Sequence, residues 1–314
     1  MTIARAHHFV PQCYLASFAQ GGKINVFDFE SGKDPFSTNT KNVAQERDFN
    51  RIDSDDLPPD ALESAYANFE GELAPVLKRL VSGAPCSEDD FSYILTLMGV
   101  LAVRNPRYRA NFADFQNNAR LKILAVQLST KERWERQLAR MRKDGYLEGV
   151  LDVPYETLKA QLEEGAFKFV TTTGEHARTE LYALDNLINI LAARTWRWVR
   201  ASNDSGGFIT SDHPVCLNWI RRPRGFAPLG YGLSGTTVYF PLSPNLAVIG
   251  EFDGPMEDLS ADVYMVANFN RRILNNAKRQ AYMADYKFRI FDGATLFGIE
   301  ELVRRSRERA REAG

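Results

Sequence analysis

Strand-like segments lie at the two ends of this 314-residue chain, and segments with helical periodicity fill its middle. The stretch 23–29 (KINVFDF) alternates apolar and polar side chains and is followed by a turn, which predicts a hairpin returning between Thr38 and Phe49. β-Branched and aromatic residues are dense again in three later segments, 206–219, 236–252 and 287–291. We therefore expect strands from both ends of the chain to share one sheet.

Helical spacing runs from Asp60 to about Arg200. Its first helix contains Pro75 and has apolar residues at steps of three and four: Leu62, Tyr66, Phe69, Leu73, Leu77 and Leu80. Ser87 with Asp90 predicts the start of a second helix, which is apolar on nearly all sides and ends before Asn105. A helix with this pattern is expected to be central and buried in the protein core.

Two further helices complete the middle. Ser129 with Glu132 predicts a capping box for a charged helix that ends near Gly145. The last helix is expected to carry one apolar stripe, made of Leu181, Leu184, Ile188, Leu191, Thr195 and Trp198.

The pattern predicts an α+β fold with a mixed or antiparallel sheet formed by the N- and C-terminal strands and a large central helical block. We expect one domain over 1–292 with a helical subdomain at 60–200, and then a charged C-terminal helix over 293–314. Two independent domains are the alternative, although the N-terminal strands are too few to be stable alone.

Composition excludes several classes of protein. The net charge of −1 gives no support to a generic nucleic-acid-binding surface, although a local basic patch is compatible with it. The three widely spaced cysteines match neither a zinc site nor a redox dithiol. Neither a signal peptide nor a membrane span is recognisable, so we expect a soluble, cytoplasmic protein. The chain also lacks a phosphate loop, a GxSxG elbow, an HExxH motif and a dinucleotide fingerprint.

Two of the four histidines are adjacent, at His7 and His8, shortly before Pro11. Proline suits the first turn of a helix, so 12–19 is predicted to be a short helix with the histidines at its positive end. There the imidazole stays neutral, as a general base or a metal ligand must be. Because neighbours in an extended segment point to opposite sides, one histidine is expected to face a site. The alternative is a pair that only fixes the entry of the chain into the core.

A second candidate segment is ITSDHPV, in which Thr210, Ser211, Asp212 and His213 crowd a strand end before Pro214. Asp212 in such a place can orient a histidine, bind a metal or accept a proton. The alternative is an Asx or Ser/Thr turn that only satisfies the backbone.

Arg104 is the third candidate, because it ends the apolar helix. A cation there is favoured by the helix dipole, and a guanidinium fork can equally hold an anionic substrate. Glu63, Glu70 and Glu72 fall on or near the polar side of the preceding helix, where most carboxylates are only solvated.

Five motifs together resemble a bacterial family, domain of unknown function 4238: HHFVPQCYLASF, ERDFN, VRNP, FITSDHPV and YFPLSP. The resemblance extends from His7 to about Tyr286. The family pattern corresponds here to His7, His8, Pro11, Tyr14, Leu15, Thr210, Ser211, Asp212, Pro214, Pro241, Leu242 and Pro244. His213 departs from the asparagine frequent in the family, and Cys13 from an aromatic residue. The resemblance implies a coherent fold but no activity.

The leading hypothesis is a hydrolase of phosphate esters, similar to a phosphodiesterase or nuclease. His7 or His8 would be the general base or a metal ligand, Asp212 a ligand or orienting carboxylate, and Arg104 the clamp on phosphate. Tyr14, Thr210 and Ser211 would contact a small anionic or nucleotide-like substrate, and His8 with Asp212 would hold any divalent metal.

Two other classes of function fit the same residues. One is a non-enzymatic sensor or partner-binding protein, in which they hold the fold together or bind a small anion. The other is a toxin or defence effector that acts on nucleic acid or a nucleotide.

Overall fold

A computed structural model describes residues 5–52, 57–147, 153–225 and 227–312. The fold belongs to the α+β class, as the sequence predicts. The chain forms two compact units, the larger from Met1–Pro106 with Ala177–Gly314 and the smaller from Arg107–His176. Among the described residues, no helix has both the length and the apolar character needed to cross a bilayer.

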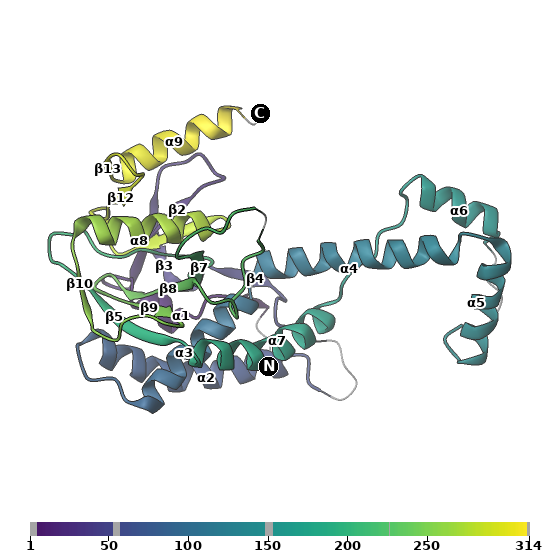
Figure 1. The fold of residues 1–314 in the computed structure, drawn as a ribbon, viewed down its shortest axis with the longest axis horizontal. Coiled ribbons are helices and arrows are strands. Elements are labelled where there is room, and N and C mark those ends of the chain that lie inside the picture. Colours follow the sequence, from purple (N-terminus) through teal and green to yellow (C-terminus); the bar gives the residue numbers. More distant parts are fainter. Residues whose placement is uncertain (1–4, 53–56, 148–152, 226, 313–314) are drawn as a thin grey trace. The chain divides into compact units, whose positions relative to one another are not determined.

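The larger unit contains two main sheets (Figure 1). A four-stranded antiparallel sheet has the order β3 (Phe36–Asn39), β2 (Lys23–Asp28), β11 (Gln280–Met283), β6 (Thr210–Ser211). It confirms that strands from both ends of the chain pair directly. A five-stranded mixed sheet has the order β10 (Leu259–Ala261), β5 (Thr195–Ala201), β9 (Leu246–Glu251), β8 (Thr236–Ser243), β7 (Cys216–Trp219). Two short pairs join β1 (Ala6–His8) to β4 (Gln45–Arg47) and β12 (Ile290–Phe291) to β13 (Leu296–Phe297).

Alternation along the strands divides the apolar side chains between two cores. In β8 and β9, Phe240 and Val248 enter the first core, whereas Tyr239 and Ala247 face the second. The same alternation sends Tyr282 of β11 into the first core. Because successive side chains of a strand point to opposite faces, each sheet must be covered on both sides.

Helices provide that cover. The first core packs against α1 (Gln12–Ala16), α2 (Ala61–Val81), α3 (Glu88–Val103) and α7 (Thr173–Ala192, within the larger unit from Ala177 on). The second packs against α8 (Val263–Asn276) and α9 (Ile299–Glu312). Figure 1 shows α8 on one side of the strands and α2 and α3 on the other. A 3₁₀ turn, η1 (Thr40–Asn42), precedes β4.

The helical middle of the sequence is thus divided between the units. Helices α5 (Lys131–Lys143), α6 (Tyr155–Glu163) and most of α4 (Pro106–Gln127) form the smaller unit. Leu128 is the one apolar side chain buried among the residues described there.

Several local predictions are confirmed, and two are wrong. Ser87 and Asp90 form the capping box of α3, and α3 is buried on most sides. The cap of α5 is Thr130 rather than Ser129, since the Thr130 hydroxyl accepts the N–H of Arg133. The expected stripe of the last helix also fails, because that helix ends at Ala192 and its buried positions are Ala177, Glu180, Leu187 and Leu191.

Candidate functional site

The two adjacent histidines have different surroundings in β1. His7 is 2% exposed, and its Nδ1 accepts the backbone N–H of Asn50 at 2.8 Å. His8 is only partly buried. Alternation along the strand makes His7 a packing residue and leaves His8 as the histidine that a ligand can reach.

The hydrogen bonds of His8 define its tautomer. Its Nε2 lies 3.3 Å from the carbonyl oxygen of Lys41, which can only accept, so Nε2 carries the proton. Its Nδ1, 3.3 Å from the side-chain amide of Gln12, is then an acceptor. Both bonds are long, so another donor can replace the Gln12 amide at Nδ1 at little cost.

Burial lowers the pKa of His8, with Arg104 and His7 acting in the same direction, while the Lys41 bond and Glu63 oppose them. The sequence predicts a neutral imidazole here but assigns it to the dipole of a longer helix. Helix α1 has only five residues, Gln12–Ala16, and desolvation is the main cause.

Arg104 is the C-cap residue of α3 and is 1% exposed. Its guanidinium stacks on Tyr66 with 3.7 Å between its central carbon and the ring centroid. None of its three nitrogens has a hydrogen-bond partner among the described residues. Burial lowers the pKa of Arg104, and Tyr66, Glu70, Glu180 and Glu63 oppose this shift. A buried guanidinium without hydrogen bonds costs free energy, and here the Tyr66 ring and the neighbouring glutamates offset that cost only in part.

Two glutamates of α2 complete the polar cluster around Arg104. Glu63 accepts the Asn50 side-chain amide at 2.6 Å, and the buried Oδ1 of Asn50 has no partner among the described residues. Burial raises the pKa of Glu70, against the pull of Arg104. We call His8, Glu63, Glu70 and Arg104 the Arg104 cluster.

Glu63 and Glu70 are predicted from the sequence to be solvated, but the structure places both beside Arg104. One signal could have found them: Glu63, Tyr66 and Glu70 are spaced i, i+3, i+7 and therefore lie on one face of α2. That face lies toward Arg104, because Glu63, Tyr66 and Glu70 all raise the pKa of its guanidinium.

Asp212 is engaged elsewhere. Its carboxylate accepts the backbone N–H groups of Lys278, Arg279 and Gln280 at 2.8, 2.7 and 2.9 Å, and its own N–H binds the Gln280 carbonyl at 3.0 Å. It also lines a cavity of about 390 Å³ together with Phe9. These bonds make Asp212 an anchor for the start of β11.

The three residues predicted to bind substrate are fully buried. The Tyr14 hydroxyl donates to the Pro241 carbonyl at 2.7 Å and lies 2.7 Å from the Thr210 hydroxyl. The Ser211 hydroxyl accepts the N–H of His213 at 3.1 Å, as expected of a Ser/Thr turn. Of the predicted site residues, the Arg104 cluster therefore includes His8 and Arg104. Tyr14, Thr210, Ser211 and Asp212 form hydrogen bonds within the strand region, and His7 binds the backbone of Asn50.

The arrangement gives no support to a metal held by His8 and Asp212. Over the part of the chain that the structure describes, no three histidine, cysteine, aspartate or glutamate side chains converge as metal ligands. Cys13 is a poor nucleophile or ligand, since burial raises the pKa of its thiol to about 12.

Comparison with known proteins gives a family but no activity. Neither the curated proteins nor the solved structures contain a match to this chain. A family model matches residues 6–287, which include both β1 and Asp212. The chain belongs to the family described as protein of unknown function (DUF4238).

Proposed function

We propose that this protein is a hydrolase of phosphate esters, of the phosphodiesterase or nuclease-like kind, with its reaction centre at the Arg104 cluster. One observation carries the proposal: the guanidinium of Arg104 is buried, and its nitrogens have no hydrogen-bond partner among the described residues. A phosphate offers the oxygens that such a fork binds, and a desolvated cation stabilises the charge that develops during P–O cleavage.

The neighbouring groups supply proton transfer. A water molecule attacks phosphorus and gives a proton to Nδ1 of His8, the ester P–O bond breaks, and the leaving oxygen takes a proton from the carboxyl group of Glu70. Lowered and raised pKa values suit His8 and Glu70 to these roles. Glu63 stabilises the imidazolium that forms, since its charge raises the pKa of His8.

Replacing the base tests this assignment. His8→Gln keeps a side chain that can bond Lys41 but removes the proton acceptor, so we expect hydrolysis of bis(4-nitrophenyl) phosphate to fall by about 10²–10⁴-fold. Oligonucleotides of DNA and RNA are assayed in parallel, each with EDTA and with Mg²⁺. His176→Gln, a control in the smaller unit, should keep the wild-type rate. Wild-type protein that hydrolyses none of these substrates above the buffer rate contradicts the proposal.

The pH dependence of kcat/KM is a second test. Activity requires neutral His8, which exists above a pKa lowered from 6.5, and protonated Glu70, which exists below a pKa raised from 4.5. We expect a bell-shaped profile with its maximum on the acid side of neutrality. Glu70→Gln should remove the alkaline limb, and a profile flat from acid to neutral pH would disprove the acid–base pair.

A further inference from the structure

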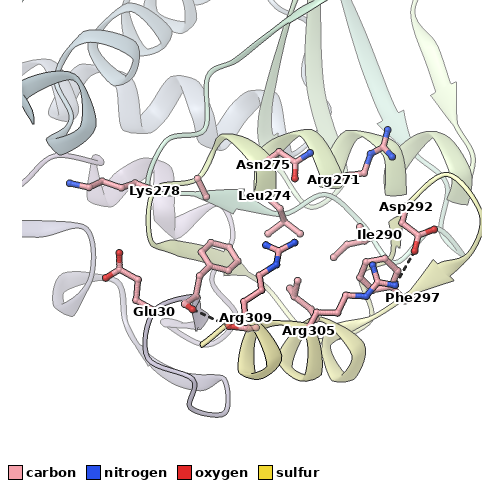
Figure 2. Close-up of a pocket in the computed structure, with 14 residues that line it drawn as sticks. Glu30, Arg271, Leu274, Asn275, Lys278, Ile290, Asp292, Phe297, Arg305 and Arg309 are labelled. Atoms are coloured by element: carbon pink, nitrogen blue, oxygen red, sulfur yellow. Dashed lines mark hydrogen bonds and ion pairs between the residues drawn. The ribbon is translucent and has the colours of Figure 1, made fainter. Parts of the chain in front are cut away.

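A cavity of about 860 Å³ lies between α8 and α9, away from the Arg104 cluster (Figure 2). Its apolar lining includes Phe29, Leu274, Ile290, Phe297 and Leu302. Four cationic side chains also line it, namely Arg271, Lys278, Arg305 and Arg309, against the two carboxylates of Glu30 and Asp292. A volume of this size is usual for small-molecule sites.

One cation and one carboxylate of the lining neutralise each other. Arg305 donates to Asp292 at 2.9 Å and to Glu301 at 2.7 Å, and its guanidinium stacks on Phe297 with 4.2 Å to the ring centroid. Asp292 also accepts the backbone N–H groups of Ala294 and Thr295. These bonds fix one wall of the cavity and neutralise the charge of Asp292.

The remaining cations are available to a ligand. The side chains of Arg271, Lys278 and Arg309 form no hydrogen bond or ion pair with any described residue, whereas Glu30 lies 3.8 Å from Arg279. In Figure 2 the guanidinium of Arg309 extends from α9 toward Leu274 on α8. Arg309 therefore places positive charge without an ion-pair partner among the described residues beside the apolar surface of the cavity, while Arg271 and Lys278 line the α8 wall with their charged ends turned away from Arg309 (Figure 2).

We propose that this cavity binds a small phosphate monoester with an aromatic body, a mononucleotide being the simplest such ligand. The phosphate would accept hydrogen bonds from Arg309 on the α9 wall, and a change of side-chain rotamer would allow Arg271 on the α8 wall to reach the same group. The rings of Phe29 and Phe297 provide the apolar and aromatic contact that a flat heterocycle needs.

The cavity is independent of the proposed reaction centre. Phe29, Arg271 and Lys278 lie inside the segment 6–287 that matches the family model, whereas Phe297 and Arg309 lie beyond it. None of the residues that line the cavity belongs to the Arg104 cluster, so hydrolysis at that cluster can fail while binding in the cavity holds.

Calorimetry with adenosine 5′-monophosphate tests the proposal on the full chain. We expect saturable binding that the Arg271→Glu/Arg309→Glu variant weakens by at least about tenfold. Arg311→Glu makes the same charge change on an exposed residue of α9 that does not line the cavity, and it should alter binding by less than about twofold. Circular dichroism and melting curves check that each variant is folded.

Other probes decide the class of ligand. Adenosine and inorganic phosphate should each bind more weakly than the monophosphate, since adenosine lacks the phosphate and inorganic phosphate lacks the aromatic ring. The proposal is overturned if the monophosphate does not bind at about millimolar concentration, or if decanoate binds more tightly. It is also overturned if Arg311→Glu weakens binding as much as the double variant does.

Discussion

Arg104→Met is expected to lower phosphodiester hydrolysis by about 10²–10³-fold while the melting temperature stays the same or rises. Methionine fills a similar volume without a charge. Burial lowers the pKa of Arg104 in spite of the surrounding glutamates, which means that burial disfavours the ionised side chain relative to the neutral one. Replacing Arg104 removes that desolvation cost and also the group that we propose to bind phosphate.

Arg194→Met is the matched comparison. Arg194 is also buried, but its guanidinium donates to the carbonyls of Thr236 and Gly250 at 2.9 and 3.2 Å and to the Thr236 hydroxyl at 2.8 Å. Its loss leaves buried acceptors without donors, so stability should fall by roughly 3 kcal/mol or more. If thermal and urea unfolding show Arg104→Met to be destabilised as strongly, Arg104 is a structural residue and the proposed centre is lost.

Asp212→Ala is expected to reduce the free energy of unfolding by roughly 3 kcal/mol, because three backbone N–H groups lose a charged acceptor at once. These donors begin β11, which pairs with both β2 and β6. The measurement is urea unfolding. Asp253→Ala, at an exposed position, should change stability by less than about 0.5 kcal/mol. A stable Asp212→Ala variant without activity would instead place Asp212 in the chemistry.

Much of the fold could be predicted because local sequence patterns, such as strand alternation and helix caps, specify its elements. Alternation in 23–29 identifies β2, and the Ser87–Asp90 pair identifies the start of α3. The prediction fails where two signals overlap. The apolar spacing after Leu181 continues through Thr195 and Trp198, yet these belong to β5, because β-branched and aromatic residues fit a strand as well as a helix stripe.

The candidate site was predictable only in part. His8 and Arg104 stand out because each lies at the end of an element. Glu63 and Glu70 were not predicted as site residues, because the neighbouring sequence does not reveal whether a side chain is solvated or buried. The pKa of Glu70 is raised by burial, and the atoms that bury it come from other segments of the chain.

The amino-acid pattern alone predicts the α+β class and the pairing of N- and C-terminal strands, and it singles out the two adjacent histidines and Arg104 as candidate site residues. Long-range contacts were needed to distinguish the buried His7 from the accessible His8, and to show that the Asp212 carboxylate accepts backbone N–H groups 66 to 68 residues further on. The physical reason is that side-chain periodicity specifies which face of its own element a residue occupies. Hydrogen-bond partners and desolvation depend on what another segment places against that face.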